Sequence, residues 1–285
     1  MAACQLIYFR RRFSGYWFAP RGPILSTRDP QKVRQILTIL SQALREVLPL
    51  HPALFYRFEP LMLANHARGA FPRRFRRQHA MSPATTVITD VTQSDDALLG
   101  AMHEKTRYNI RVSAKQGIHV RLGTHDDMDA FIALMRETSS RDAFTPHEET
   151  YLRATYDALA SSGMARIRIA EYHKQPLAAN MEMAFGDTVT YLHGASSSTH
   201  RHAMAPYALH WDALRAARDE GWRFYDWWGC NPDRVSNYYY KPSWQGITRF
   251  KRGWGGEFVE YAGTWDLPLQ RFLYRLAFPQ FWLRG

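Results

Sequence analysis

The chain has 285 residues, of which 46% are hydrophobic and 22% charged, so it is a globular protein of one large or two smaller domains and not a disordered chain. Lysine and arginine outnumber aspartate and glutamate by 37 to 26, and the net charge of +11 favours phosphate polyanions or anionic lipid headgroups as partners, although a merely basic surface has the same charge. No apolar run reaches the roughly 18 residues of a membrane-spanning helix, the opening residues lack a signal-peptide pattern, and two cysteines build no disulfide framework; we expect a cytoplasmic protein.

The first part of the chain predicts a strand hairpin, a helix and a further strand. Residues 5–9 and 16–18 have the apolar and aromatic composition of strands. Asp29, followed by a proline, is a typical helix start, and apolar residues recur at helical spacing from there until Pro49. Residues 53–60 then indicate a buried strand.

The middle of the chain predicts a strand at 85–91, followed by one long helix from Ser94 to about Gln116 that Gly117 ends. A strand over 118–123 follows it. Residues 126–137 and 148–159 have the apolar periodicity of two more helices.

The second half predicts a meander of three strands, a helix and a further strand. The meander covers 164–172, 177–185 and 188–196; the later elements are a helix from Pro206 to Gly221, a strand over 222–229, a hairpin whose arms are 246–250 and 257–263, and an amphipathic helix over 269–276. The order strand, loop, helix, strand occurs over 16–58 and again over 188–228, which indicates an internal duplication. We expect an α+β protein with mixed sheets, and this order matches the acyltransferase fold called GNAT.

Six motifs in the same order as in one family extend this resemblance over essentially the whole chain. They are PRGP at 20–23, KTRYNIRVSAKQGIHV at 105–120, YLHGASS at 191–197, APYALHW at 205–211, FYDWWG at 224–229 and FKRGWGG at 250–256. Together they resemble the FemABX peptidyltransferases, the Fem ligases of peptidoglycan interpeptide bridges.

The resemblance implies two GNAT-like domains, the first over 1–122 with a C-terminal helix at 267–285 that crosses back onto it, and the second over 123–266. Family members usually carry a longer region before the PRGP motif, so we expect a first domain shortened at its N-terminus. The implied reaction moves glycine, alanine or serine from aminoacyl-tRNA to an amine on the stem peptide of a peptidoglycan precursor. The acceptor is either UDP-MurNAc-pentapeptide or lipid II, and no cofactor is implied.

The chemistry requires a group that stabilises the tetrahedral oxyanion formed when an amine attacks the ester. The resemblance implies Lys251 for this role; the alternative is a hairpin lysine on a solvated face. Asp226 is a candidate to orient or deprotonate the acceptor amine, or it bonds backbone groups in the loop after its strand. Four further residues are candidates for substrate contact, each with a structural role as the alternative: Tyr191, Tyr207, Arg21 and Arg252.

Basic residues on the predicted long helix and before the strand at 85–91 are candidates for tRNA backbone contacts, with a solvated face as the alternative. They are Arg107, Arg111 and Lys115 on the helix, and Arg73, Arg74, Arg76 and Arg77 around Phe75. The loop at 196–206 contains no glycine, which argues against acetyl-CoA as the donor.

Other constellations predict less. Four histidines (His193, His200, His202 and His210) lack a cysteine or carboxylate at metal-ligand spacing, so no metal site is expected. Cys230 has no paired histidine that would make it a nucleophile. The tail, with Phe272, Leu273, Leu276, Phe278, Phe281 and Trp282 beside Arg271 and Arg275, either packs against the first domain or contacts a membrane surface.

Three other functions stay open at this point. The first alternative is a tRNA-dependent ligase of a peptide natural product, and the second is an acyl-CoA N-acyltransferase. The third is an RNA- or membrane-binding protein without enzymatic activity. The amino acid transferred and the oligomeric state are not determined by these patterns.

Overall fold

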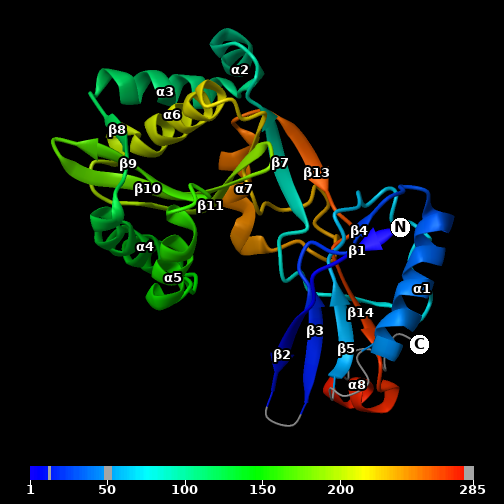
Figure 1. Cartoon of the computed structure of the whole chain (residues 1–285). Helices are drawn as coiled ribbons and strands as arrows, with labels where there is room; N and C mark the ends of the chain where they lie inside the picture. Colours follow the sequence, from blue (N-terminus) through cyan, green and yellow to red (C-terminus); the bar gives the residue numbers. More distant parts are fainter. Residues whose placement is uncertain (12–13, 48–52, 279–285) are drawn as a thin grey trace. The chain divides into compact units, whose positions relative to one another are not determined.

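The computed structural model describes residues 1–11, 14–47 and 53–278 (Figure 1). The chain divides into two compact units. Unit 1 consists of Met1–Thr85, Asn231–Pro242 and Val259–Gly285, and unit 2 of Thr86–Cys230 and Ser243–Phe258. No helix among the described residues is long and apolar enough to cross a bilayer.

Unit 1 is built on a five-stranded sheet in the order β2-β3-β5-β14-β6. The strands are β2 (Ile7–Arg10), β3 (Gly15–Ala19), β5 (Ala53–Phe58), β6 (Arg76–Gln78) and β14 (Thr264–Pro268). A separate pair joins β1 (Ala2–Ala3) to β4 (Ile24–Leu25). Helix α1 (Pro30–Val47) packs on the sheet face that presents Tyr56 and Phe58. Helix α8 (Arg271–Ala277) packs through Tyr274 on the face that presents Phe55.

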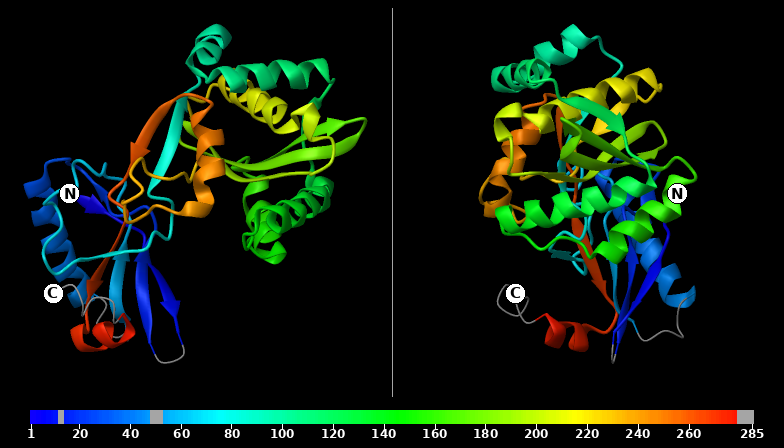
Figure 2. Two further views of the ribbon diagram at one scale, coloured as in Figure 1. Left: turned by 180° about the vertical axis from the view of Figure 1, so that it is seen from behind. Right: turned by 90° about the vertical axis from the view of Figure 1, so that its left-hand side faces the viewer.

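Unit 2 is built on a seven-stranded sheet in the order β13-β7-β12-β11-β10-β9-β8. The strands are β7 (Thr85–Asp90), β8 (His119–Leu122), β9 (Ala165–Tyr172), β10 (Gln175–Phe185), β11 (Thr188–Ser196), β12 (Phe224–Asp226) and β13 (Glu257–Glu260). The helices are α2 (Asp95–Ala101), α3 (Glu104–Lys115), α4 (Met128–Asp142), α5 (Glu149–Ala160), α6 (Ala205–Asp219) and α7 (Gln245–Arg252). Helices α4 and α5 cover one face of the central strands and α6 the other (Figures 1 and 2).

The expected α+β architecture with mixed sheets and an internal duplication is confirmed. In unit 1, strand β3 precedes α1 in the chain and β5 follows it, and the two strands pair in parallel. In unit 2, β11 and β12 pair in parallel on either side of α6, and the antiparallel meander of β9, β10 and β11 precedes them. The expected N-cap of α1 is present, because Asp29 Oδ1 accepts a 2.8 Å hydrogen bond from the Lys32 amide. Pro49 lies outside the described residues.

The expected single helix over 94–116 is wrong, because α2 and α3 are separate. Met102 leaves the helical conformation with ψ 153, and His103 caps α3 by accepting a 3.2 Å hydrogen bond from the Lys105 amide at Nδ1. The His103 amide donates to the carbonyl of Gly253 at 2.9 Å. A contact between residues far apart in sequence therefore replaces a helical hydrogen bond.

The expected hairpin after residue 245 is wrong in its first arm, which is the helix α7. Its second arm, β13, pairs with β7 instead. Gly255 and Gly256 make the turn between α7 and β13 with φ 76 and φ 98. A Cβ there would lie 2.8 Å from the Ala101 carbonyl oxygen and 2.6 Å from that of Ile88, respectively, so both positions require glycine.

The C-terminal segment from Val259 belongs to unit 1. It contributes more than the expected helix, because β14 enters the sheet between β5 and β6. Residues 86–122 belong to unit 2, where α3 packs on α6 and β8 pairs with β9.

Candidate functional site

Lys251, in the last turn of α7, is buried within unit 2, with 6% of its surface exposed. Its Nζ donates a 2.8 Å hydrogen bond to the carbonyl oxygen of Gly229 and lies 5.1 Å from the centroid of the Tyr191 ring. Burial lowers the pKa of Lys251 to about 8, and the nearby Cys230 and Asp226 oppose this shift. The solvated hairpin lysine considered from the sequence is therefore wrong.

The loop after β12 supplies the acceptor for Lys251, and Asp226 shapes that loop. Asp226 Oδ1 accepts a 2.8 Å hydrogen bond from the Trp228 amide and another from the Thr86 hydroxyl. Trp228 has φ 57, an uncommon conformation for a residue with a side chain. The turn held by Asp226 thus immediately precedes the Gly229 carbonyl that accepts from Lys251. This is the structural role considered for Asp226; its role in proton transfer stays a prediction.

Aromatic rings surround Lys251 and Tyr191 on the α6 face of the sheet. The His210 ring of α6 lies 4.4 Å from that of Tyr191 and 5.1 Å from that of Trp227. Trp227 stacks on Trp254 at 5.1 Å, and its indole nitrogen donates to the Thr89 hydroxyl at 2.9 Å. Rings of this kind exclude water, which strengthens electrostatic interactions inside the site.

His210 is held neutral in this cluster. Burial, with smaller contributions from Lys251 and Arg168, lowers its pKa to about 3. Its Nδ1 is buried and has no hydrogen-bond partner among the described residues. The side chain therefore adds no positive charge next to Lys251.

A β-bulge decides which side chains of β11 reach the site. Tyr191 pairs with Glu182 and His193 with Met181, so the register shifts between them. Because Met181 and Glu182 are consecutive, they point to opposite faces, and so do Tyr191 and His193. His193 thus lies on the α4 side, where its ring centroid is 5.2 Å from that of His147, and not beside His210.

Beneath the aromatic rings lies a buried ionic network that joins four elements. Glu182 on β10 is fully buried and accepts from Arg166 Nε at 2.8 Å and from the Tyr225 hydroxyl at 3.3 Å. Arg168 on β9 connects Glu182, at 3.5 Å, to Asp212 on α6, at 2.5 Å. The network ties β9, β10, β12 and α6 together under Tyr191 and His210.

A pocket of about 140 Å³ lies where β11 ends and α6 begins. Tyr207 lines it and packs on Trp254 at 5.8 Å. Arg141 also lines it, and its Nη1 donates to the Ser196 carbonyl at 2.8 Å. The N-terminus of a helix favours anionic groups, so this pocket suits a polar, negatively charged ligand.

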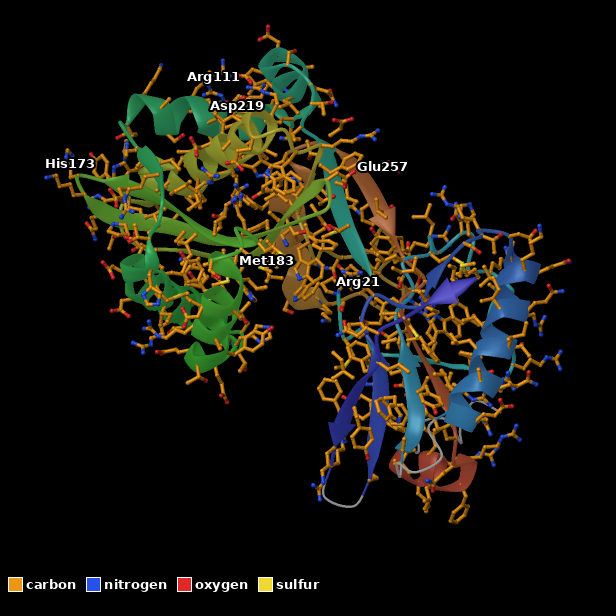
Figure 3. The ribbon with its side chains drawn as sticks, in the orientation of Figure 1. Arg21, Arg111, His173, Met183, Asp219 and Glu257 are labelled. Atoms are coloured by element: carbon orange, nitrogen blue, oxygen red, sulfur yellow. The ribbon has the colours of Figure 1, made fainter. Side chains whose placement is uncertain are left out.

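The predicted tRNA residues of unit 2 divide into one structural and two exposed side chains. Arg107 Nη1 donates to the carbonyl oxygens of Leu99 and Met102, so it caps the end of α2. Arg111, labelled in Figure 3, and Lys115 are both exposed on α3. The latter two remain candidates for a phosphate backbone.

The predicted tRNA residues of unit 1 are less uniform than the sequence implies. Phe75 is a core residue with 4% of its surface exposed, so its ring is not accessible for stacking with a nucleotide base. Arg74 binds the Ser41 hydroxyl and the Thr38 carbonyl of α1. Arg77 lies over the Tyr239 ring at 4.5 Å, whereas Arg73 is exposed.

Two predicted substrate arginines lie over aromatic rings. Arg21, in unit 1, has φ 51 and its guanidinium lies 5.5 Å from the Tyr261 ring centroid. Arg252, in unit 2, lies 4.1 Å from that of Phe258. Neither residue is part of the cluster around Lys251.

The model of the FemAB family matches residues 69–175 and 164–278 of this chain. The chain belongs to the FemAB family. The lipid II:glycine glycyltransferase of Staphylococcus haemolyticus is 22% identical in an alignment of 262 positions that covers 69% of this chain and 61% of that protein. The corresponding enzyme of Staphylococcus aureus is 23% identical over 264 residues, with the same coverage of both chains. This FemAB protein thus spans 61% of the length of these curated relatives.

A crystal structure of FemX superposes on the FemAB chain with a TM-score of 0.82, covering 96% of this chain and 86% of FemX at 19% sequence identity. This likeness establishes the shared fold. It agrees with the GNAT-like arrangement of strand, helix and parallel strand in each unit.

Sequence reasoning on this FemAB chain missed His210, Trp227, Trp254 and the network of Arg168 and Glu182. From the sequence, His210 is considered only as a possible metal ligand, although it lies within the APYALHW motif. Trp227 and Trp254 lie within two of the quoted motifs, so the signal was present. The sequence signal for Arg168 and Glu182 is weaker. It consists of charged residues within strand segments whose other residues are mostly apolar.

Proposed function

We propose that this FemAB protein is a transferase that moves an aminoacyl group from aminoacyl-tRNA to an amine on the stem peptide of a peptidoglycan precursor. The transferred residue is glycine, alanine or serine, and the product is part of an interpeptide bridge. The observation that carries the proposal is the buried Lys251, fixed by a 2.8 Å hydrogen bond to Gly229 among aromatic rings. Support also comes from the family and from relatives named lipid II:glycine glycyltransferase.

The reaction forms a C–N bond to the acceptor amine and breaks the ester C–O bond to the tRNA ribose. The attacking amine loses a proton, and the ribose oxygen gains one. Between these events the carbonyl oxygen carries a negative charge. The ammonium of Lys251 has three N–H donors and uses one of them for the Gly229 carbonyl, so it has further donor capacity for that oxygen. Asp226 positions the loop whose Gly229 carbonyl orients Lys251.

The pocket at the start of α6 is where we place the terminal nucleotide of the donor. Tyr207 offers an aromatic face for a base, and Arg141 and Arg201 line the same pocket. Arg111 and Lys115 are proposed to contact the tRNA backbone from α3. An acyl-CoA donor is less well supported, since the loop before α6 lacks the glycines that hold a pyrophosphate.

A transfer assay with radiolabelled glycyl-, alanyl- and seryl-tRNA tests the proposal. The acceptors are UDP-MurNAc-pentapeptide and lipid II, each with and without RNase, and a parallel arm supplies acetyl-CoA. We expect RNase-sensitive transfer to at least one acceptor. Consumption of acetyl-CoA with RNase-insensitive activity would overturn the proposal.

Two lysine variants assign the site. Lys251→Ala is expected to reduce transfer on the order of 100- to 1,000-fold, which is typical for loss of one oxyanion donor. Lys32→Ala is the matched control, because Lys32 is exposed on α1 and should leave transfer unchanged. Equal activity of both variants would remove Lys251 from the mechanism.

A further inference from the structure

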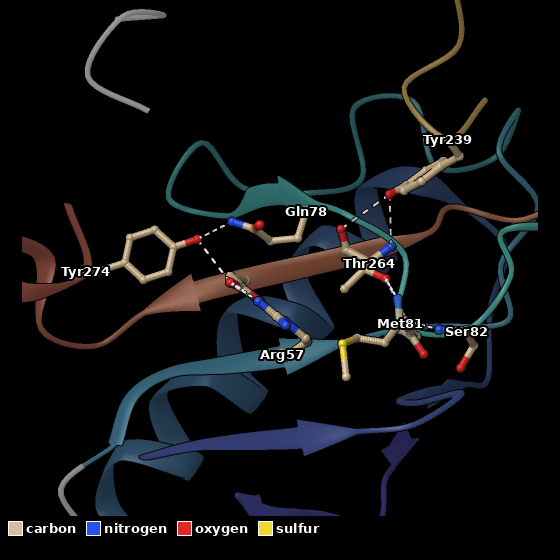
Figure 4. Close-up of polar contacts among 9 residues, drawn as sticks. Arg57, Gln78, Met81, Ser82, Tyr239, Thr264 and Tyr274 are labelled. Carbon is tan, nitrogen blue, oxygen red and sulfur yellow. Dashed lines mark hydrogen bonds and ion pairs between the residues drawn. The ribbon is translucent and has the colours of Figure 1, made fainter. Parts of the chain in front are cut away.

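Apolar side chains are exposed on α8 of unit 1 even though the helix is anchored to the sheet. Tyr274 is 2% exposed, and its hydroxyl donates to Asp266 Oδ2 at 3.0 Å and accepts from Gln78 at 2.6 Å (Figure 4). Asp266 is itself held by Arg57 at 2.7 Å and 2.9 Å. Because Tyr274 fixes how α8 is rotated, the opposite side of the helix must face away from the sheet.

The outward side of α8 is apolar. Phe272 is 68% exposed, Leu273 45% and Leu276 58%. Residues three and four apart on a helix are neighbours, so these side chains form one patch. A monomeric soluble protein rarely leaves such a patch without a partner. Phe281 and Trp282 lie outside the described residues.

A second exposed apolar pair lies at the same end of unit 1, on β2. Ile7 and Phe9 on β2 are 40% and 39% exposed. Phe9 stacks on Tyr16 at 5.2 Å, Tyr16 on Phe55 at 4.8 Å, and Phe55 contacts Tyr274 at 5.5 Å. Rings therefore connect β2 to α8 across the sheet, and both elements lie at one end of this unit (Figures 1 and 2).

Positive charge accompanies the apolar side chains. The segments 1–20, 53–58 and 264–278 contain one acidic residue, Asp266, which is fully buried and neutralised by Arg57. Arg10 and Arg271 are exposed on β2 and α8. Burial, and then the charges of Arg45 on α1 and Arg271 on α8, lower the pKa of Arg74, so Arg271 lies near other positive charges of unit 1.

We propose that the surface formed by α8 and β2, with Phe272, Leu273, Leu276, Ile7 and Phe9 flanked by Arg10 and Arg271, binds the surface of an anionic lipid bilayer. Aromatic and leucine side chains enter the boundary between headgroups and acyl chains, and the arginines attract the anionic headgroups. A polyanion such as RNA would use the arginines but leave the apolar side chains without a partner. This surface holds the protein where a lipid-linked acceptor lies, and in that respect it rests on the proposed function.

Vesicle co-sedimentation of the full chain tests the surface. The vesicles consist of phosphatidylcholine with or without phosphatidylglycerol, at low and at high salt. We expect binding to the anionic vesicles that weakens with salt, because exposed charges are screened. No preference for the anionic vesicles would overturn the proposal.

Matched variants locate the contact. Phe272→Ser with Leu276→Ser is expected to weaken vesicle binding on the order of tenfold by removing apolar contact. Arg10→Gln with Arg271→Gln is expected to weaken it on the order of 25-fold, about fivefold for each charge, and to reduce its salt dependence. Ile39→Ser on α1, where Ile39 is 65% exposed, is the control and should bind like the parent chain. All changed residues are exposed, and circular dichroism checks that the variants fold.

Other outcomes assign the surface elsewhere. Variants that bind vesicles normally but lose tRNA binding would make it an RNA contact. Loss of a dimer in sedimentation without vesicles, at unchanged vesicle binding, would make it a contact between copies. Transfer to the nucleotide-linked acceptor should be unchanged in the surface variants, whereas transfer to lipid II in vesicles should fall. A parent chain that binds anionic vesicles yet transfers to neither acceptor would contradict the proposed function alone.

Discussion

The hydroxyl of Tyr191 occupies the space that a side chain at Gly194 would fill. A Cβ built on Gly194 lies 1.8 Å from the Tyr191 hydroxyl oxygen and 2.4 Å from its ring. The glycine of the YLHGASS motif thus leaves room for the tyrosine that packs beside Lys251. The structure thus indicates a steric requirement for glycine at this position.

Gly194→Ala should therefore destabilise the protein by about 1–3 kcal/mol, because the buried Tyr191 ring has to move. Denaturant unfolding measures this change. In a Tyr191→Ala background, Gly194→Ala should lower the free energy of unfolding by less, because the Tyr191 ring that a Cβ would meet is gone. Gly100→Ala is the control, since nothing lies within 4 Å of a Cβ there, and it should leave stability equal or slightly higher. An equal cost of Gly194→Ala in both backgrounds would disprove the steric explanation.

Transfer activity should decline as the pH rises above about 8, the value to which burial lowers the pKa of Lys251. The reason is that a neutral amine no longer compensates the charge of the oxyanion. The measurement is kcat/KM from neutral to alkaline pH with the nucleotide-linked acceptor. Lys251→Arg should shift the alkaline limb upward, because a guanidinium stays charged. Activity that instead increases through this range would make Lys251 a proton acceptor.

Asp226→Asn should retain most of the activity, since an amide oxygen still accepts from Trp228 and Thr86. Asp226→Ala should lose stability of about 1–2 kcal/mol and part of the activity, because both donors lose their partner and the Gly229 carbonyl shifts. Steady-state transfer and unfolding of the two variants provide the comparison. A loss in the asparagine variant as large as that in Lys251→Ala would instead support proton transfer by the carboxylate.

Stability should decrease as the pH falls below about 6.5, in part because of His210. Its folded pKa of about 3 lies below the unfolded value of 6.5, so between these values only the unfolded state binds the proton. The free energy of unfolding should then fall by about 2 kcal/mol between neutral pH and pH 5 from this group alone. His210→Gln should lack that part of the pH dependence, while His202→Gln, at an exposed position, should keep it. Identical pH profiles for both variants would contradict the burial of a neutral imidazole.

Most of the elements could be predicted because their patterns are local. The meander of unit 2 has turn residues between apolar runs, and α1 begins at a capping aspartate. The strands and the helix can therefore be predicted from these local patterns. The errors occur where distant residues decide. The break between α2 and α3 depends on a hydrogen bond to Gly253, and α7 was read as a strand because its short sequence contains β-branched residues.

The sequence by itself determined the family, the duplicated order of elements and the lysine of the FKRGWGG motif. Only the tertiary structure decided what surrounds that lysine: its burial, the Gly229 acceptor, the neutral His210 and the bulge that separates Tyr191 from His193. The physical reason is that burial, pKa and hydrogen-bond partners arise when α6, α7, β11 and β12 pack together. Motif spacing along the chain carries no measure of that packing.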